Sequence, residues 1–396
     1  MSSPLQDIVV VDLTRALSGP QAAMMLGDMG ARVIKVESPG HGDDSRGWGP
    51  PWVGPDGDIS TYFLAANRNK ESVALDLKSA AGRQVLERLV GRADVLLENF
   101  RPGTLERLGF SVERLHELNP RLVIGSISGF GHDGPEGDRP GYDQIGQGEG
   151  GLMSLTGPDA EHPYRVGVPI ADLLSGMNLA YGVVTALYER ERTGRGRVVR
   201  TSLLASVVGV HALHGTAYTV AGVVGRPRGN QHPAIVPYGL FSCRDAQVQI
   251  AIAAESQWVR FCAVFGLDPN APGLATNRER VANRSAAVAA VEAAIADWDA
   301  DPLLARLAEC GIPAGRVRAI DEVYEWEQVA SQGLLLEVDH SVLGPVTLPG
   351  PPIRFDDNVR AGGRDQHLAP PALGEHTDSV LAWLAGSDAS ERPEQS

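Results

Sequence analysis

Ile8-Val-Val-Val-Asp-Leu13 and Gly30-Ala-Arg-Val-Ile-Lys-Val36 are two apolar runs that flank a segment beginning with Ser18-Gly-Pro20. Each run has the length and the branched side chains of a buried strand, and Pro20 suits the first turn of a helix. A strand, a helix and a second strand in this order predict a parallel βαβ unit. The first turn lacks the G-x-G-x-x-G pattern, so we do not expect a standard dinucleotide site.

The same alternation continues along the chain. The pattern predicts a helix over Ala80–Val90 and strands over Ser72–Leu77, Val95–Glu98 and Leu122–Ser128. Alternating strands and helices are typical of an α/β domain with a parallel sheet. Ligands of such sheets bind beyond the carboxyl ends of the strands. The loops expected there are Thr14–Gly19, Ser38–Gly42, Asn99–Gly103 and Gly129–Gly141.

The remaining chain indicates a second, smaller domain. A second buried helix is predicted over Leu203–Val220, and a Gly- and Pro-rich linker follows it. A hairpin and helices then favour an α+β domain. We therefore expect residues 1–224 to form the first part of a large α/β domain and residues 225–325 the small domain. Residues 326–396 should return to the large domain, with a disordered tail after Ser387.

Composition excludes several classes of partner. The 396-residue chain has a formal net charge of −14, which disfavours nucleic acid and anionic membranes. It has no apolar run long enough to span a membrane and no signal-peptide pattern at its start, so a cytoplasmic location is expected. Its 3 cysteines are too few and too scattered for a disulfide framework or a zinc site, and we interpret them as buried apolar residues.

The lysines have an uneven distribution. Of the 35 lysines and arginines, the only lysines are Lys35, Lys70 and Lys78, all in the first fifth of the chain. Arginine-rich codon usage would leave a few lysines by chance. The alternative is that this region needs compact point charges for a polyphosphate ligand.

Carboxylate chemistry is the strongest catalytic candidate. Asp172 lies where the run Val166–Ala171 meets an apolar helix, and Asp143 lies in a loop before another apolar stretch. Either residue could simply cap a helix. Asp172 could instead be a nucleophile that the helix dipole keeps ionised. The pair His211 and His214 has ligand-like spacing but no nearby Cys or Glu, so no metal site is expected.

Several motifs, in order and along nearly the whole chain, carry a resemblance to a family. They are Val11-Asp-Leu-Thr-Arg-Ala-Leu-Ser-Gly-Pro20, Gly30-Ala-Arg-Val-Ile-Lys-Val-Glu37, Asn67-Arg-Asn-Lys-Glu-Ser-Val-Ala-Leu-Asp-Leu-Lys78, Asp94-Val-Leu-Leu-Glu-Asn-Phe-Arg-Pro-Gly103, Gly167-Val-Pro-Ile-Ala-Asp-Leu-Leu-Ser-Gly176 and Leu373-Gly-Glu-His-Thr377. With these motifs the chain resembles the class III CoA-transferases, the group that includes formyl-CoA transferase, carnitine CoA-transferase and α-methylacyl-CoA racemase. The resemblance implies a Rossmann-like large domain with a parallel sheet, a smaller α+β domain and an interlocked homodimer.

The resemblance also implies a mechanism. Asp172 would attack an acyl-CoA thioester, form an anhydride and then an aspartyl-CoA thioester, and pass CoA to an acceptor carboxylate. Coenzyme A thioesters would be substrates, and no permanently bound cofactor or metal is expected. A helix N-terminus would keep Asp172 ionised at neutral pH and stabilise developing oxyanions.

Residues that match the family's CoA site follow from the same resemblance. They are Arg15, Ala16, Leu17, Ser18, Leu75, Lys78, Asn99, Phe100, Arg107, Tyr142 and Asp143. Formyl-CoA transferase has glutamine where Leu17 stands, which argues against oxalate as the natural acceptor. It has arginine where Ser38 stands, so another basic residue should meet the phosphates. A substrate loop containing Gly229, Asn230 and Gln231 is expected to close over Asp172.

Two other functions stay open. A racemase or epimerase would use Asp172 and Asp143 as acid and base, but the racemases have a histidine where this chain has Tyr142. Because tyrosine is a poor base near neutral pH, this favours the transferase. A CoA-binding module without catalysis would need Asp172 only as a cap. Succinyl-CoA as donor and a dicarboxylic, branched or aromatic acid as acceptor are compatible with Leu17.

Overall fold

The computed structural model describes residues 3–355 and 361–386 and divides into two compact units. The large unit comprises Met1–Leu152, Arg165–Val223 and Trp326–Ser396, and the small unit comprises Met153–Tyr164 and Val224–Glu325. Residues 153–164 therefore group with the small unit, although the sequence placed them in the large domain. The tail expected to be disordered, after Ser387, lies outside the described residues.

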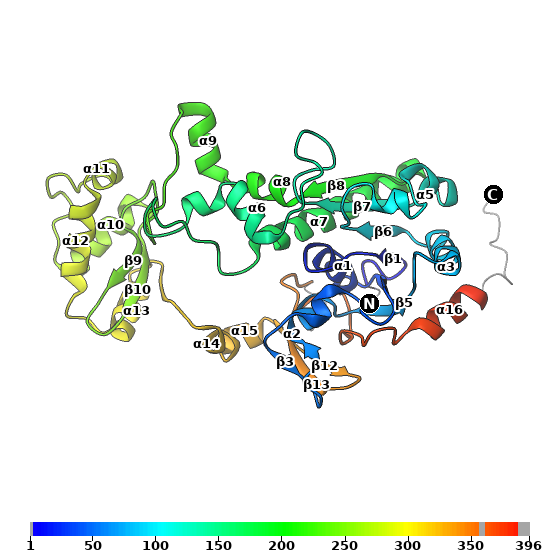
Figure 1. The fold of residues 1–396 in the computed structure, drawn as a ribbon. Coiled ribbons are helices and arrows are strands. Elements are labelled where there is room, and N and C mark those ends of the chain that lie inside the picture. The colour runs from blue at the N-terminus through cyan, green and yellow to red at the C-terminus, as the bar shows by residue number, and fades with distance from the viewer. Residues whose placement is uncertain (1–2, 356–360, 387–396) are drawn as a thin grey trace. The chain divides into compact units, whose positions relative to one another are not determined.

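Within the described residues of the large unit, six parallel strands form one sheet in the order β5-β2-β1-β6-β7-β8 (Figure 1). Their bounds are β1 Val9–Asp12, β2 Arg32–Glu37, β5 Lys70–Ala74, β6 Val95–Glu98, β7 Val123–Ser128 and β8 Val198–Ser202. The parallel α/β sheet predicted from the sequence is confirmed. Because the chain runs from β1 to one side first and later to the other, the order reverses between β1 and β6.

Helices cover both faces of this sheet. Residues such as Val10 and Val33 pack against α1 (Ser18–Asp28) and α7 (Ile170–Thr193). Their neighbours along the strands pack on the opposite side, because successive strand side chains point to opposite faces. The helices on that side are α3 Ala80–Val90, α4 Thr104–Arg107, α5 Val112–Leu118 and α16 Thr377–Gly386.

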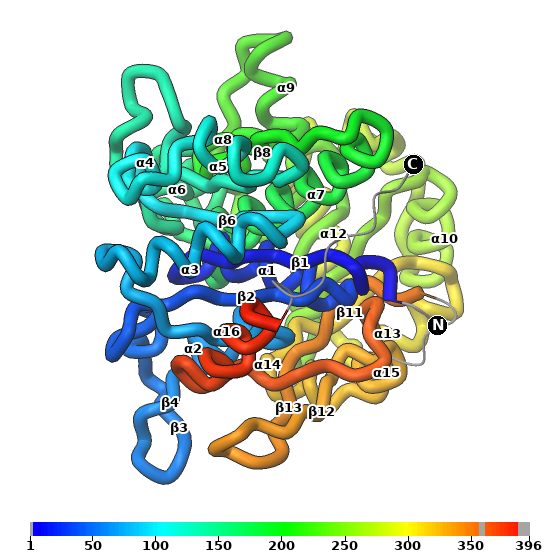
Figure 2. The backbone as a smooth tube through the Cα atoms, turned by 90° about the vertical axis from the view of Figure 1, so that its right-hand side faces the viewer, coloured from blue at the N-terminus to red at the C-terminus, as the bar shows by residue number. Residues whose placement is uncertain are grey.

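The C-terminal segment returns to the strands from the start of the chain (Figure 2). There α16 lies next to β5 (Figure 1). The Thr377 hydroxyl accepts a hydrogen bond from the Ala74 backbone N–H at 3.1 Å. The elements before α16 and those around the cavity described below are short. They are β3 Trp52–Val53, β4 Ile59–Ser60, α2 Thr61–Ala66, α6 Asp143–Glu149, α15 Glu327–Ser331, β12 Leu335–His340 and β13 Gly344–Pro349.

The predicted buried helix over Leu203–Val220 is wrong. The chain forms α8 (Leu203–Gly209) and α9 (Ala212–Ala221), which are bent by 78°, and no described residue of α9 is buried. Apolar content alone could not distinguish a core helix from one with an exposed apolar surface. Among the described helices, α7 is long and apolar enough to cross a membrane, but one side of it, with Leu179, Val183 and Leu187, packs on the sheet.

The small unit contains a three-stranded antiparallel sheet in the order β11-β10-β9. Trp258 and Phe261 of α10 are buried in its core, which also contains residues of the sheet and of α12 and α13. Its elements are β9 Tyr238–Ser242, β10 Gln247–Ala251, α10 Glu255–Phe265, α11 Asn277–Ala282, α12 Arg284–Ile295, α13 Ala300–Glu309, β11 Ala314–Arg316 and α14 Ile320–Tyr324.

Candidate active site

A cavity of about 470 Å³ lies in the large unit beyond the carboxyl ends of β1 and β6, where the strand order reverses. Three of the four loops that the sequence placed at this edge line it, and Ser38–Gly42 does not. The wall residues from these loops are Arg15, Ala16, Ser18, Asn99, Phe100, Arg101, Pro102, Gly129, Arg139, Pro140 and Gly141. Arg15 and Asn99 join the two strand ends, since the Asn99 side chain bonds to the Arg15 N–H and carbonyl, both at 2.8 Å.

Asp172 forms part of the wall and lies in the first turn of α7. The residue in the N-cap position is Pro169, which makes no side-chain cap bond. The Asp172 carboxylate instead accepts a hydrogen bond from the Ser18 hydroxyl, which lies at the start of α1. The helix therefore does not use Asp172 as its cap.

Asp143 supplies the cap. Its Oδ1 accepts the backbone N–H of Ala171 at 2.8 Å and that of Asp172 at 3.4 Å. Its Oδ2 accepts the Gln147 amide at 2.7 Å, which fixes the orientation of the carboxylate. Asp143 thus satisfies the free N–H groups at the start of α7 and leaves the Asp172 side chain available to the cavity.

The environment raises the pKa of Asp172 to about 7. Burial is the main cause and the nearby charge of Asp143 adds to it, while the Ser18 hydrogen bond acts in the opposite direction. The expectation that the helix N-terminus keeps this carboxylate ionised at neutral pH is therefore corrected. Desolvation and like-charge repulsion outweigh the stabilisation from the helix dipole, which is typically below about 2 kcal/mol.

A close approach of two helices sets the position of Ser18 relative to Asp172. A Cβ on Gly176 would lie 2.6 Å from the Ser18 carbonyl oxygen and 3.0 Å from Gln21 Cβ. Only glycine permits this distance between α1 and α7, one turn beyond Asp172. The position of Ser18 therefore depends on a residue that carries no side chain.

Two aromatic residues of the wall were not predicted from the sequence. Trp48 and Tyr62 line the cavity, and their rings meet edge to face at 5.1 Å between centroids. Burial, with the charges of Asp172, Asp143 and Asp43, raises the pKa of Tyr62 to about 12. Tyr62 is therefore a neutral hydroxyl close to the carboxylates, and only the fold brings it there.

Glu98 is a further titratable residue near the cavity wall that was not predicted from the sequence. It ends β6, and its carboxylate accepts hydrogen bonds from the Phe100 backbone N–H at 2.9 Å and from the Ser126 hydroxyl. Burial raises the pKa of Glu98 to about 7. These bonds fix the backbone that carries Phe100 in the cavity wall.

The structure brings most, but not all, of the expected CoA-site residues together. Arg15, Ala16, Ser18, Asn99, Phe100, Tyr142 and Asp143 line the cavity with Asp172. Leu17 is only 6% exposed and Leu75 packs in the core of the sheet, so neither is among the wall residues described. Lys78 and Arg107 are exposed elsewhere on the large unit. Gly229, Asn230 and Gln231 belong to the small unit.

The polyphosphate interpretation of the lysines is wrong for two of them. Lys35 and Lys70 have no exposed side-chain surface and form ion pairs with Asp43 and Asp12, respectively. The sequence could not show this, because a lysine in a strand can face either solvent or a buried carboxylate. Lys78 alone is exposed.

The fold and the cavity define a parallel α/β protein with a cavity at the reversal of strand order and an aspartate carboxylate in the cavity wall. The model of CoA-transferase family III matches residues 5–377. The chain belongs to this family and is a class III CoA-transferase, as the sequence resemblance implied.

Named relatives agree with this assignment. The chain is 37% identical to succinyl-CoA:glutarate CoA-transferase of Mus musculus, over 96% of this chain and 86% of that protein. It is 38% identical to acetyl-CoA:oxalate CoA-transferase of Acetobacter aceti, over 98% and 97%. The crystal structure of a CAIB/BAIF family protein from Brucella suis matches with a TM-score of 0.84 and 38% identity, over 97% of this chain and 100% of that one.

Proposed function

We propose that this enzyme transfers CoA from an acyl-CoA donor to a carboxylic acid through a covalent aspartyl-CoA intermediate on Asp172. The carboxylate oxygen attacks the thioester carbonyl, the C–S bond breaks, and a mixed anhydride and CoA thiolate form. The thiolate attacks Cγ of Asp172 and releases the donor acid. The acceptor carboxylate then attacks the same carbon and displaces the thiolate, which finally attacks the acceptor's acyl carbon. Asp172 is regenerated without consumption of water.

The observation that carries this proposal is the division of labour between Asp143 and Asp172. Asp143 caps α7, so the Asp172 carboxylate faces the cavity next to the Ser18 hydroxyl. A non-catalytic module would need Asp172 as the cap, and the cap is Asp143. A pKa of about 7 leaves part of Asp172 ionised near neutral pH and keeps its basicity, and therefore its nucleophilicity, high.

We propose succinyl-CoA as donor and a dicarboxylic acid larger than oxalate as acceptor. Relatives named for succinyl-CoA with glutarate and with mesaconate support this substrate class. Leu17 offers no hydrogen-bond donor for a small polar acyl group, although its burial makes any effect on the acceptor indirect. Arg15, Arg101 and Arg139 at the cavity are the cations proposed for substrate carboxylates and CoA phosphates.

We propose that the protein is a cytoplasmic homodimer and that each subunit consists of the large and the small unit described above. An exposed apolar stripe on α7 supports binding of a second subunit. Its residues are spaced three or four positions apart, so they lie on one side of the helix. They are Met177, Tyr181, Val184 and Tyr188, all at least 43% exposed. Leu213, Tyr218 and Val220 of α9 are exposed as well. The interlocked arrangement and the closure of Gly229–Gln231 over Asp172 are predictions from the family resemblance.

Covalent trapping tests the proposal. After incubation with succinyl-CoA, the protein should carry a hydroxylamine- and borohydride-sensitive adduct on the peptide that contains Asp172. Asp172→Asn should carry none, and CoA exchange between succinate and glutarate should disappear with it. Absence of any adduct and of any CoA exchange across a broad panel of acids, oxalate included, would refute the transferase.

Solvent exchange distinguishes the racemase. A racemase that uses Asp172 and Asp143 would incorporate deuterium at the α-carbon of a 2-methylacyl-CoA without an acceptor acid, and Asp143→Asn would abolish this. The transferase predicts no such incorporation and predicts that Asp143→Asn still forms the adduct.

A further inference from the structure

The loop between β1 and α1, residues Thr14–Leu17, is held by side chains from three other segments of the large unit. Lys35 of β2 donates from Nζ to the Thr14 carbonyl at 2.9 Å. Asp43 accepts the Ala16 backbone N–H at 3.0 Å. The reciprocal bonds of Asn99 hold Arg15 between them. The backbone of this short loop therefore has few polar groups without a fixed partner.

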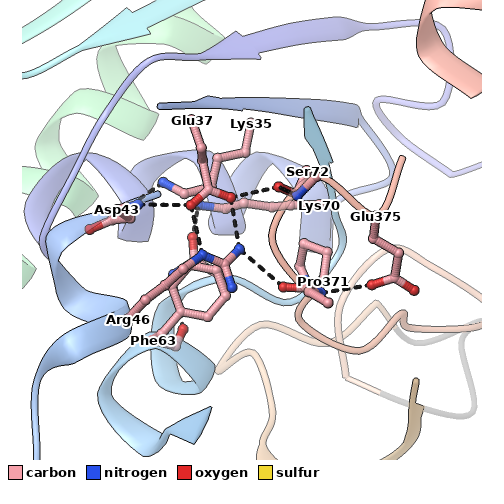
Figure 3. A network of polar contacts seen from close by, with 12 residues as sticks. Lys35, Glu37, Asp43, Arg46, Phe63, Lys70, Ser72, Pro371 and Glu375 are labelled. Atoms are coloured by element: carbon pink, nitrogen blue, oxygen red, sulfur yellow. Dashed lines mark hydrogen bonds and ion pairs between the residues drawn. The ribbon is translucent and has the colours of Figure 1, made fainter. Parts of the chain in front are cut away.

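Asp43 and Lys35 form an ion pair (Figure 3), and both residues bond to the loop. Asp43 Oδ2 lies 2.8 Å from Lys35 Nζ, while Oδ1 accepts bonds from Ala16 and from the Ser45 N–H and hydroxyl. Both side chains are completely buried. Burial alone would raise the pKa of Asp43, but the Lys35 ammonium holds it below the ordinary value, so the pair stays charged.

Further charged groups hold the pair on one side and the two ends of the loop on the other. Glu37 Oε2 accepts the Asp43 backbone N–H at 2.9 Å and a bond from Arg46 at 2.8 Å (Figure 3). On the other side, Lys70 donates to Asp12, to Asn67 and to the Pro20 carbonyl in the first turn of α1, each at 2.9 Å. The three donors of a lysine ammonium suit this role, because they can serve three separate acceptors.

The loop carries backbone strain at the point that Asp43 holds. Ala16 has φ of +65°, in the left-handed region that is costly for residues other than glycine. Such a conformation persists where surrounding contacts impose it. Two residues further on, Ser18 donates its hydroxyl to Asp172. The contact of Asp43 with Ala16 is thus connected to the nucleophile through one short, strained segment.

We propose that Asp43, oriented by Lys35, is a positioning residue that holds Ser18 against Asp172 and thereby controls formation of the covalent adduct. The proposal rests on the function proposed above. Asp43 does not line the cavity, and it acts through Ala16 and Ser18. Two carboxylate oxygens are needed, because one serves Lys35 and the other serves Ala16.

The test removes one of these oxygens. Asp43→Asn has a single carbonyl oxygen and cannot satisfy Lys35 and Ala16 together. Asp28→Asn is the matched control, since Asp28 is equally buried, pairs with Arg68 at 2.6 Å and lies at the far end of α1. The rate of adduct formation from succinyl-CoA, measured in a single turnover, should fall about tenfold or more for Asp43→Asn. It should stay within about threefold of wild type for Asp28→Asn, at a similar loss of melting temperature.

A double-mutant cycle with Ser18→Ala separates positioning from general damage. If Asp43 acts through Ser18, the variant with both substitutions should react no more slowly than the slower single variant. Asp28→Asn should combine with Ser18→Ala multiplicatively. Multiplicative losses for Asp43→Asn with Ser18→Ala, or equal slowing by Asp28→Asn, would overturn the proposal.

A second Asp43 variant and the wild-type reaction distinguish failure of the positioning role from failure of the proposed function. If Asp43→Asn does not fold, Asp43→Glu keeps the charge and displaces the oxygens by one methylene, with Asp28→Glu as its control and the same expected order of rates. If the wild type itself forms no adduct and exchanges no CoA across the panel of acids, the proposed function fails, whatever the variants do. If the wild type reacts and the Asp43 variants match their Asp28 controls, only the positioning role fails.

Discussion

At the scale of single residues, the site is defined by two aspartates whose environments give them different roles. One carboxylate oxygen of Asp143 accepts a hydrogen bond from the start of α7, and the other accepts one from Gln147. The Asp172 carboxylate accepts a hydrogen bond from the Ser18 hydroxyl and lines the cavity. The pair illustrates how position in a fold, rather than residue type, determines which carboxylate caps a helix and which one is available to the cavity.

The pH dependence of adduct formation should follow the ionisation of Asp172. The rate at low substrate should rise with pH and level off above about pH 7, because only the ionised carboxylate attacks. Asp143→Asn removes a like charge, so the rising part of the pH–rate profile should move to lower pH. Ser18→Ala removes a hydrogen bond that stabilises the carboxylate, so the rising part should move to higher pH. Single-turnover rates between about pH 5 and pH 9 measure both. Shifts in the same direction would contradict the assignment.

The raised pKa of Asp172 also predicts a stability cost. Between its ordinary pKa of 3.8 and about 7, the folded state holds a proton at this site that the unfolded state has lost, so the free energy of unfolding falls as pH rises through that window. Asp172→Asn removes this cost. We expect it to be more stable than wild type above about pH 7, on the order of 2–4 kcal/mol, and similar near about pH 4. Thermal melts at both pH values check this, and a variant less stable at the higher pH would disprove it.

At the scale of elements, the site depends on how closely α1 approaches α7. Gly176→Ala would place a Cβ 2.6 Å from the Ser18 carbonyl oxygen, so the helices must separate. We expect a loss of about 1–3 kcal/mol of stability from overpacking. The rate of adduct formation should fall about tenfold or more, because Ser18 moves away from Asp172.

Gly209→Ala is the control for this substitution. Its Cβ would meet nothing within 4 Å, and the residue ends a helix in the same unit. It should leave the rate unchanged and the stability equal or slightly higher, since alanine is the better helix former. Equal rates for the two variants would show that the helix contact does not position Ser18.

At the scale of the whole molecule, the exposed apolar stripe of α7 predicts a self-associated protein. Light scattering after size exclusion should give twice the chain mass of 42.0 kDa. Tyr181→Glu, within the stripe, should lower the melting temperature or the dimer fraction more than Val342→Glu, which places the same charge on an exposed hairpin turn. A wild-type protein that is monomeric at micromolar concentration would refute the homodimer.

Local pattern was sufficient for the elements that depend on neighbouring residues. The helix Ala80–Val90 and the strand Val95–Glu98 were predicted to the residue, because periodicity and capping residues are local signals. The strand Val198–Ser202 was missed, since its apolar run is short and partly exposed. The exposure of α9 was also missed, because an apolar helix reads the same whether it is buried in a core or lies on a surface.

The sequence by itself therefore determined the parallel sheet, the placement of the ligand loops at one edge and the candidacy of Asp172. Only the tertiary structure decided that Asp143 caps α7, that Leu17 is buried, and that Lys35 pairs with Asp43 next to the loop that lines the cavity. The physical reason is the range of the interactions. Strand and helix formation depend on residues a few positions apart, whereas burial and ionisation depend on partners that the fold brings from distant parts of the chain.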